Sequence, residues 1–304
     1  MTSSTETLTH PEISHPLFPE KKVIPVFKTK DYAITKEVFQ LLEVENTGFR
    51  FTSPIPSEEI ISKYYDDECY ISHSKTSENF KDKLFHFARF YTLGMKRRVV
   101  NFNYKGTEKK LLDLGCASGE FAGKMKDSGW DVLGIEPAEK ARIFASGEHG
   151  LDVFQKLDDI PDKSTFSVIT AWHVLEHIHN IENCFHKMHD LLNDDGVLIA
   201  ALPNFKSFDA DFYKEVWAGY DVPRHLYHFS PASIVHIAEQ HGFKLKQIRR
   251  MWLDAFYVSL LSESYMNTGF AGYPGAFFVG LWSNILAMFK KEKCSALIYV
   301  FSKR

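Results

Sequence analysis

The chain has 304 residues, of which 44% are hydrophobic and 25% charged, and its formal net charge at pH 7 is -3. This length and balance predict a folded protein with one large domain and an accessory region. A weakly negative chain provides no general field for nucleic acid, so we expect no nucleic-acid partner. The four cysteines are scattered without a Cys-x-x-Cys pair, which favours reduced thiols and a cytoplasmic location.

The first segment, residues 1–105, is predicted to be an accessory region that is mostly helical. It begins with several prolines, and its first residues lack the basic head and apolar stretch of a secretory signal. A short helix is expected from about Ser57 to Tyr64. Apolar residues at helical spacing predict a longer helix over Lys81 to Asn103.

From Lys110 onward, predicted strands and helices alternate. This order predicts an α/β fold, namely a Rossmann-like, mainly parallel sheet of seven strands with helices on both faces. The domain would span 106–304, with insertions at about 205–229 and 254–293. The predicted helix boundaries are Gly196 as a stop, Ser230-Pro231 as a start and Gly242 as a second stop. The predicted strands are Lys110–Leu114, Asp131–Ile135, Leu151–Phe154, Phe166–Ala171, Val197–Leu202, Lys244–Met251 and Ala296–Phe301.

The most informative stretch is Leu111 to Phe121, a buried strand that leads into a glycine-bearing turn and then a helix. Gly115 and Gly119 can adopt backbone angles that a Cβ forbids, and Ala117 adds only a methyl group, so a ligand can approach the backbone. A second apolar run ends in Glu136, roughly 20 residues further on, where nucleotide-binding folds hold ribose hydroxyls. Together these features predict an adenosine-containing cofactor. The alternative is that the glycines merely form a tight turn.

The same loop distinguishes between two kinds of cofactor. A dinucleotide places its pyrophosphate on the helix N-terminus and requires Gly-x-Gly-x-x-Gly, whereas this chain has Gly115, Ala117 and Glu120 at those positions. Glu120 would repel a pyrophosphate at close range. The acidic surround of Asp113, Glu120 and Glu136 suits a positively charged, phosphate-free ligand. S-adenosylmethionine fits this description, with a dinucleotide as the alternative.

Four motifs occur in order between about Lys109 and the C-terminus. They are Asp113-x-Gly115-x-Ala117-x-Gly119, Glu136-Pro137, Trp172-His173-Val174-Leu175-Glu176-His177 and Leu202-Pro203-Asn204. In this order they resemble the class I S-adenosylmethionine-dependent methyltransferases. The His-Val-Leu-Glu-His run is similar to quinone-biosynthesis O-methyltransferases, and Pro223 to Pro231 resembles a bacterial subgroup of uncharacterised small-molecule methyltransferases. The resemblance implies transfer of a methyl group to a small-molecule acceptor, at oxygen.

The resemblance also implies which residues contact the cofactor, and that N-terminal helices cover the site as a lid. Two departures from the family pattern stand out. Ala117 stands where the family more often has glycine, and 44–51 lacks the paired cysteines with which relatives bind zinc, so we expect no zinc there. The alternatives to a methyltransferase are a dinucleotide-dependent oxidoreductase and a non-catalytic protein of the same fold. The expected cofactor contacts are Asp113, Gly115, Cys116, Ala117, Gly119, Glu136, Pro137 and Trp172.

Four histidines are candidates for the base that removes a proton from a hydroxyl nucleophile, because the ordinary pKa of histidine suits this role near neutrality. His173 and His177 flank Glu176 after the fourth strand, and His225 and His228 lie in the first insertion. For each of them the alternative is a hydrogen-bonded structural histidine.

A metal site is a second possibility for part of this group. His173, Glu176 and His177 would share one face of a helix, because they stand at i, i+3 and i+4. The quinone O-methyltransferases that the chain resembles have a carboxylate-rich version of this triplet linked to a magnesium requirement. His173 in place of a carboxylate favours a softer metal. We expect no functional metal and keep this triplet as the alternative.

The insertion 205–229 is rich in aromatic residues and is predicted to form the acceptor pocket. Its expected acceptor contacts are Tyr220, Arg224 and Tyr227. Arg224 either clamps an acidic group of the acceptor or forms a salt bridge with Asp221, and the salt bridge is the plainer option.

One uncharged stretch, 266–289, raises the question of a membrane. Glycine, proline and asparagine interrupt it, and its apolar part from Ala276 to Phe289 is shorter than the ~20 residues of a spanning helix. We therefore expect no transmembrane segment. A buried or lid helix is the plainer interpretation, and an interfacial helix with weak contact to a membrane surface is the alternative. The oligomeric state is not predicted.

Overall fold

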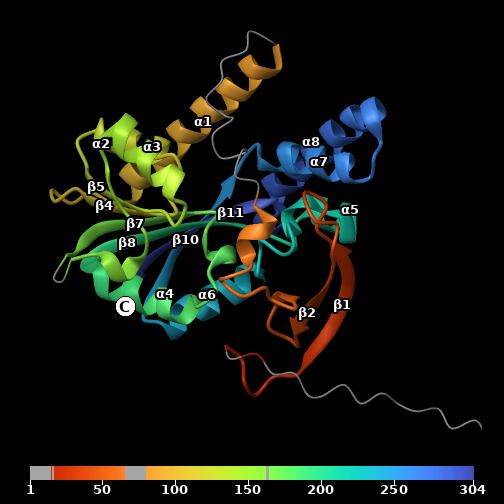
Figure 1. Cartoon of the computed structure of the whole chain (residues 1–304), viewed down its shortest axis with the longest axis horizontal. Coiled ribbons are helices and arrows are strands. Elements are labelled where there is room, and N and C mark those ends of the chain that lie inside the picture. Colours follow the sequence, from red (N-terminus) through yellow and green to blue (C-terminus); the bar gives the residue numbers. More distant parts are fainter. Residues whose placement is uncertain (1–14, 16, 66–79, 162–163) are drawn as a thin grey trace, which may run out of the picture.

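Two sheets organise the fold (Figure 1). The computed structural model describes residues 15, 17–65, 80–161 and 164–304, with the side chains of 80–89 excepted. Cys69, one of the four cysteines, lies outside the described residues, and the three described cysteines are buried free thiols.

The larger sheet contains the seven strands predicted from the sequence. They are β4 (Lys110–Leu114), β5 (Asp131–Ile135), β6 (Asp152–Phe154), β7 (Phe166–Trp172), β8 (Leu192–Pro203), β10 (Phe243–Met251) and β11 (Ala296–Lys303). Their order in space is β10-β11-β8-β7-β4-β5-β6. The neighbours from β8 to β6 pair in parallel, whereas β11 runs antiparallel to both β8 and β10. The predicted mainly parallel α/β arrangement is confirmed.

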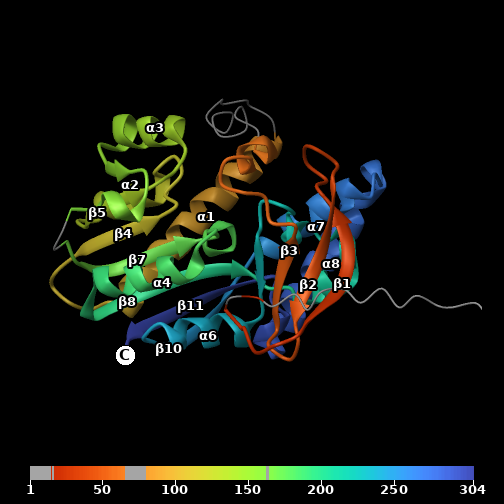
Figure 2. The ribbon, with the colours of Figure 1, turned by 60° about the horizontal axis from the view of Figure 1, so that its bottom comes forward.

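Helices cover both faces of this sheet, because alternate strand residues point to opposite sides. The helices are α1 (Phe80–Asn103), α2 (Glu120–Lys126), α3 (Glu139–His149), α4 (Ile181–Leu191), α5 (Phe208–Tyr213), α6 (Pro231–Gln240), α7 (Asp254–Tyr265) and α8 (Gly272–Phe289). Leu111 packs in one cluster with Phe121 of α2, whereas Leu112 packs in another with Phe185 of α4 and Ile237 of α6. Figure 2 shows α2 and α3 on one side of the sheet and α6 on the other.

The second sheet corrects the prediction of a mostly helical N-terminal region. It is antiparallel, in the order β1 (Val23–Lys30), β2 (Val38–Val44), β3 (Phe49–Ser53) and β9 (Tyr227–Phe229). Three of the five residues of β3 are buried, and its aromatic and β-branched residues favour strands. Pro25 is tolerated because β1 lies at the edge of the sheet. The predicted helix from Ser57 is reduced to the 3₁₀ turn η1 (Ile61–Tyr64), whereas the long helix is confirmed as α1.

The two sheets are joined through the first insertion. β9 comes from this insertion but pairs with β3, so N-terminal residues and insertion residues share one sheet. The buried carboxylate of Asp209 on α5 ties the insertion to the C-terminal part of the chain. It accepts hydrogen bonds from the hydroxyl of Ser283 on α8 at 2.8 Å, from that of Ser295 at 2.7 Å and from the indole of Trp217 at 2.8 Å. Each buried oxygen of Asp209 therefore has a partner.

Two of the three predicted helix boundaries agree with the structure. The Ser230 hydroxyl accepts the Ser233 N–H at 3.2 Å and caps α6, and Gly242 follows the end of α6 with φ +80°. Gly196 was wrongly expected to stop a helix. It lies inside β8, and a Cβ there would come within 2.7 Å of the Leu192 side chain, so the glycine is required by packing within the strand.

Candidate functional site

The glycine turn after β4 lies beside the ends of β5 and β7, at the carboxyl edge of the parallel strands. Gly115 and Gly119 have φ values of +66° and +80°, and Ala117 between them has φ +48°. A Cβ on Gly115 would come within 2.5 Å of the Val174 side chain, and one on Gly119 within 2.8 Å of Ala145. Packing against protein, in addition to the left-handed backbone, therefore requires both glycines.

Glu136 follows β5 and holds the turn in place. It is 4% exposed, and its two carboxylate oxygens accept the backbone N–H groups of Ala117 at 3.0 Å and Ala138 at 2.9 Å. Burial raises the pKa of Glu136 above its ordinary value, although these two hydrogen bonds oppose the shift. Because each carboxylate oxygen has a further lone pair, the residue can still accept hydrogen bonds from ligand hydroxyls.

Asp113 at the end of β4 is buried beside a lysine that the sequence analysis did not select. One Asp113 oxygen accepts the Thr170 hydroxyl at 2.6 Å, and burial raises the pKa of Asp113 to about 7. The Lys96 ammonium of α1 lies 5.0 Å from the ring centre of Trp172. Burial lowers the pKa of Lys96 to about 8, and the carboxylates of Asp113 and Asp254 oppose that shift. The charges of Lys96 and Asp113 therefore lie close enough at this edge to influence each other's pKa.

A sequence signal for Lys96 exists. Lys96 stands three and four positions before the buried residues Val99 and Val100, so it shares their face of α1 rather than the solvated face expected for a basic run. Arg98 in the same run is exposed.

The other expected cofactor contacts have mixed environments. The Cys116 thiol is buried, its pKa is raised by burial, and it packs so closely that a Cβ on Gly134 would come within 2.6 Å of its sulfur. Pro137 is exposed, and its carbonyl accepts the Arg142 guanidinium at 2.5 Å. Trp172 is 7% exposed, and its indole N–H lacks a partner among the described residues. This orphaned donor fits a site that a polar ligand completes.

His173 follows Trp172 and has the left-handed backbone conformation, with φ +59°. Its Nδ1 lies 3.5 Å from a carboxylate oxygen of Glu176, and its buried Nε2 has no partner within the described part of the chain. Burial alone would lower the pKa of His173, but Glu176 raises it above its ordinary value. Burial alone would raise the pKa of Glu176, but His173, His225 and His177 hold it below the ordinary value. The two residues form a dyad at the end of β7.

The possible metal ligands differ from the predicted triplet. The chain from Leu175 to His177 forms only a short 3₁₀ turn, η4, so His173 does not share a helical face with Glu176 and His177. Instead, His225 joins them: one potential ligand atom from each of Glu176, His177 and His225 lies within 4.8 Å of the others. The Nδ1 atoms of His177 and His225 lie 2.9 Å and 3.0 Å from the carbonyl oxygens of Arg224 and Gly219. If each Nδ1 carries the proton that these carbonyls accept, Nε2 is left with its lone pair.

The fourth histidine and the expected acceptor contacts are engaged with protein groups. His228 is buried, its Nε2 lies 3.1 Å from the Thr52 hydroxyl, and burial lowers its pKa well below the ordinary value. The Tyr220 hydroxyl accepts the Arg50 guanidinium at 3.0 Å, and the Tyr227 hydroxyl donates to a backbone carbonyl at 2.9 Å.

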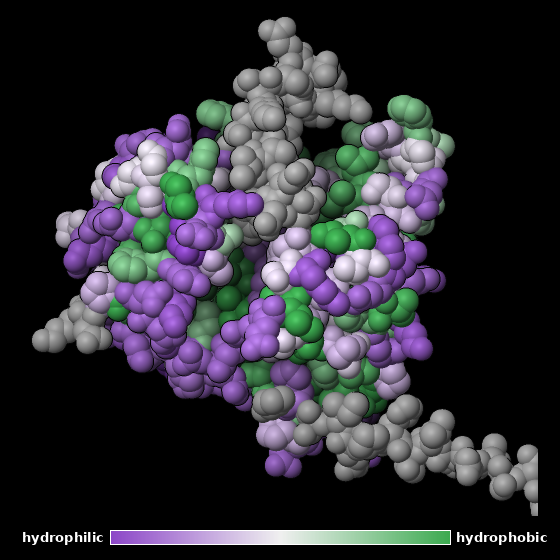
Figure 3. Space-filling view, in the orientation of Figure 1, coloured by the Kyte–Doolittle hydropathy of each residue, from purple (hydrophilic) through white to green (hydrophobic). Residues whose placement is uncertain are grey.

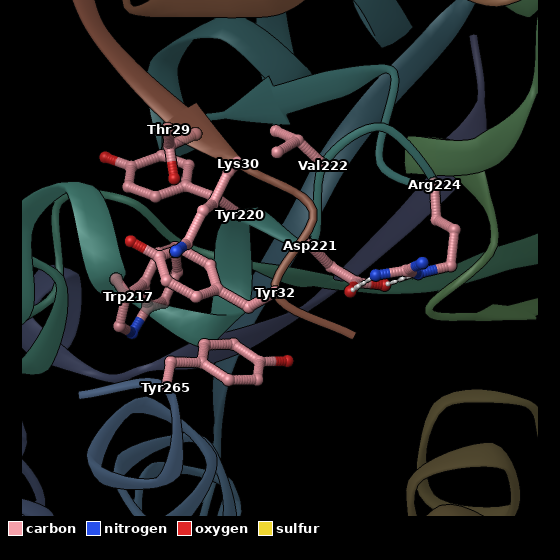
Figure 4. Close-up of a pocket in the computed structure, with 9 residues that line it drawn as sticks. All are labelled: Thr29, Lys30, Tyr32, Trp217, Tyr220, Asp221, Val222, Arg224 and Tyr265. Carbon is pink, nitrogen blue, oxygen red and sulfur yellow. Dashed lines mark hydrogen bonds and ion pairs between the residues drawn. The ribbon is translucent and has the colours of Figure 1, made fainter. Parts of the chain in front are cut away.

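Arg224 forms the salt bridge that was the plainer option. Its guanidinium lies 2.6 Å from Asp221 and 3.1 Å from Asp31, and it also donates to the Tyr64 carbonyl at 2.7 Å. In Figure 4 the guanidinium faces Asp221 rather than the hollow beside it. These contacts use the guanidinium N–H groups that Arg224 would need to bind an acidic group of the acceptor.

Two small hollows occur near the insertion. One is lined by Thr29, Lys30, Tyr32, Trp217, Tyr220, Asp221, Val222, Arg224 and Tyr265 (Figure 4). The other is lined by Pro203, Phe205, Trp217, Gly219, His225, Tyr227, His228 and Phe229. Each has an open volume of about 10 Å³, which is room for one water molecule. Neither hollow includes a residue of the glycine turn.

An α/β sheet with a glycine turn after one strand and a buried carboxylate after the next defines a protein that binds an adenosine-containing ligand. The family model described as a methyltransferase domain matches residues 86–248, more than half of the chain, so the chain belongs to this family. It is an S-adenosylmethionine-dependent methyltransferase, as the sequence motifs predicted. The dinucleotide-dependent oxidoreductase and the non-catalytic protein are not supported.

Curated relatives agree with this assignment, and a solved structure shares the fold. The chain is 28% identical over 159 residues to the ubiquinone biosynthesis O-methyltransferase of Glaesserella parasuis serovar 5 (strain SH0165), covering 46% of this chain and 67% of that one. It is 24% identical over 188 residues to the enzyme of the same name from Pelagibacter ubique (strain HTCC1062), covering 56% and 76%. Magnesium protoporphyrin IX methyltransferase from Synechocystis PCC 6803 with bound SAH shares the fold, with a TM-score of 0.54, 13% identity and coverage of 82% and 100%. The resemblance to quinone-type O-methyltransferases is confirmed.

Proposed function

We propose that the protein transfers the methyl group of S-adenosylmethionine to an oxygen atom of a small-molecule acceptor in the cytoplasm. Relatives named ubiquinone biosynthesis O-methyltransferases support oxygen as the target. The observation that carries the proposal is the set of groups at the sheet edge. Lys96 lies 5.0 Å from the ring centre of Trp172, whose indole N–H has no partner among the described residues, and the buried carboxylates of Asp113 and Glu136 lie at the ends of the paired strands β4 and β5. This set matches a ligand with an amino-acid tail, a ribose and no phosphate.

Each end of the methyl donor has a residue of suitable chemistry. Glu136 accepts hydrogen bonds from the ribose hydroxyls through its remaining lone pairs. Lys96 pairs with the carboxylate of the amino-acid tail, and Asp113 pairs with its ammonium group. A bound carboxylate would restore the pKa of Lys96 that burial lowers, because an opposite charge favours the ammonium form.

His173 is the base in this proposal. Its unpartnered Nε2 accepts the proton of the acceptor hydroxyl, while Nδ1 faces Glu176. The acceptor oxygen then forms a bond to the methyl carbon as the carbon–sulfur bond breaks, and the sulfur keeps the electron pair. Glu176 stabilises the imidazolium that results. Alignment of the two reactants supplies most of the acceleration, because in-line displacement requires a near-attack geometry.

The accessory elements complete the site. We propose that residues 1–105 cover the acceptor as a lid and that the insertion 205–229 shapes the acceptor pocket, since β3 and β9 pair in one sheet. In this proposal the sheet shapes the acceptor pocket, and Arg224 does not contact the acceptor.

The experiment that tests the proposal combines binding with turnover. Calorimetry should show binding of S-adenosylmethionine and S-adenosylhomocysteine, and no binding of NAD. Transfer of a labelled methyl group to phenolic acceptors should fall by about 100-fold or more in His173→Ala, with the affinity for S-adenosylhomocysteine unchanged. Equal activity in His173→Ala and the unmodified protein would remove His173 as the base.

A second candidate mechanism is metal-assisted transfer. It is favoured by the grouping of Glu176, His177 and His225, whose donor set suits a transition metal such as zinc. Removal of metal with a chelator decides between the two mechanisms. We expect full activity in chelator. The metal mechanism would be established if the chelator removed the activity, a divalent ion restored it, and His225→Ala had no activity with or without the ion.

A further inference from the structure

The hairpin of α7 and α8 exposes an apolar face of unusual extent. Among the described residues, more than half of the large apolar side chains that the structure exposes lie between Leu253 and Phe289. The hairpin projects at the upper right in Figure 1, and Figure 3 shows hydrophobic side chains over it with paler and hydrophilic ones between them. Phe270 at its tip is 88% exposed, and Phe289 at its end is 81% exposed. Scattered surface apolar residues need no explanation, but a continuous face does.

The exposed residues of α8 follow helical spacing over its whole length. Phe277, Phe278, Leu281, Trp282 and Met288 are all exposed, whereas the opposite side of the helix is buried. An α-helix of 18 residues is about 27 Å long, so the face is as long as a small domain is wide. The described chain contains no helix long and apolar enough to cross a bilayer. This geometry is that of a helix lying along a surface.

Charge is absent from this face and present at its end. Between Asp254 and Lys290 the sequence has one ionisable acid, Glu263, which is 9% exposed and accepts the Tyr213 hydroxyl at 3.1 Å. Lys290 and Lys291 follow directly and are exposed. Lysines beside an aromatic-rich apolar face complement anionic lipid headgroups. A protein partner would be expected to meet polar groups within the face, as most interfaces carry about one hydrogen bond per 100–200 Å².

We propose that the α7–α8 hairpin docks on the surface of a lipid bilayer that contains anionic lipids. α8 lies in the headgroup region with Phe278, Trp282 and Phe289 inserted, and Lys290 and Lys291 contact the headgroups. This inference is independent of the methyl acceptor, because the docking is measured without turnover.

The test uses the full chain and vesicles, either of phosphatidylcholine alone or mixed with phosphatidylglycerol. Of the five tryptophans, Trp282 is 52% exposed, so its emission should shift to shorter wavelength when mixed vesicles are added, and Trp282→Phe should abolish the shift. Phe278→Glu should weaken vesicle binding by about tenfold or more, because insertion of the ring is lost. Ile143→Glu is the matched control, since Ile143 on α3 is 66% exposed and Phe278 is 67% exposed.

Substitution of Lys290 and Lys291 separates the electrostatic contribution to vesicle binding from the apolar contribution. Each of Lys290→Gln and Lys291→Gln should weaken binding to mixed vesicles by about fivefold, with little effect on phosphatidylcholine alone. Vesicle binding that Phe278→Glu leaves unchanged would overturn the proposal. So would a dimer in sedimentation that Phe278→Glu dissociates while vesicles show no binding, because the face would then belong to a second copy of the chain.

Discussion

The Nδ1 atom of His173 lies 3.5 Å from the buried carboxylate of Glu176, and the opposite ring nitrogen has no partner among the described residues. A carboxylate on one side of an imidazole and an unpaired nitrogen on the other is the geometry of an oriented general base. His173 has this orientation in a left-handed backbone conformation, directly after the end of β7.

The dyad predicts a pH dependence of catalysis. Glu176 raises the pKa of His173, and the base must be neutral, so kcat/KM should fall as pH decreases through that raised pKa. Glu176→Gln removes the charge, so the acid limb should move to lower pH while the plateau rate falls by about tenfold or more. A pH–rate profile measures both effects. Glu182→Gln, an exposed site on α4, is the control, and an unmoved acid limb in Glu176→Gln would separate Glu176 from the base.

Glu136 should determine the affinity for the methyl donor. Glu136→Ala removes the hydrogen bonds to the ribose, which are worth about 1.5–3 kcal/mol, so affinity for S-adenosylhomocysteine should fall by roughly 10- to 150-fold. Calorimetry measures this loss, with the exposed Glu139→Ala as control. A change of less than twofold would place Glu136 outside the site.

Lys96 should contribute to binding of the amino-acid tail of the methyl donor and not to binding of its adenosine. Lys96→Met should weaken binding of S-adenosylhomocysteine by about tenfold or more, because a charged contact to the carboxylate is lost. It should leave 5′-methylthioadenosine unaffected, since that compound lacks the amino-acid tail. Arg98→Met is the matched control on the exposed side of α1. Equal losses for both ligands would show that Lys96 supports the fold rather than the tail.

Arg224 should contribute to stability rather than to acceptor binding. Arg224→Met leaves the buried Asp31 and the partly buried Asp221 as charges without their cation, which should cost about 3 kcal/mol of the free energy of unfolding. Burial raises the pKa of both carboxyls, but hydrogen bonds and Arg224 lower them overall, so this stabilisation is present at neutral pH and is lost as pH falls through their folded-state pKa values. Denaturant unfolding measures the free energy of unfolding of the unmodified protein and of Arg224→Met. The difference between the two proteins should be large at pH 7 and smaller in acid. A large rise in acceptor KM for Arg224→Lys, with unchanged stability, would instead show that Arg224 binds an acidic group of the acceptor.

The local parts of the fold were predictable from the sequence because their signals are local. The strands β4 and β5 are short apolar runs with the predicted bounds, and Ser230 caps α6 through a contact three residues away. In the second sheet, β1, β2 and β3 pair with neighbours in the chain, and their aromatic and β-branched residues are a strand signal that the prediction of a mostly helical region overlooked. Only the pairing of β3 with β9, almost 180 residues later, is encoded by no periodicity. The grouping of His225 with Glu176 and His177 depends on another contact between distant segments, in which the Leu226 N–H donates to the Glu176 carbonyl at 2.8 Å.

The account depends most directly on where the methyl donor binds. A crystal structure of the protein with S-adenosylhomocysteine should show its ribose on Glu136 and its amino-acid tail between Asp113 and Lys96. Density for the ligand elsewhere, or an edge that binds NAD in preference to S-adenosylhomocysteine, would contradict the account.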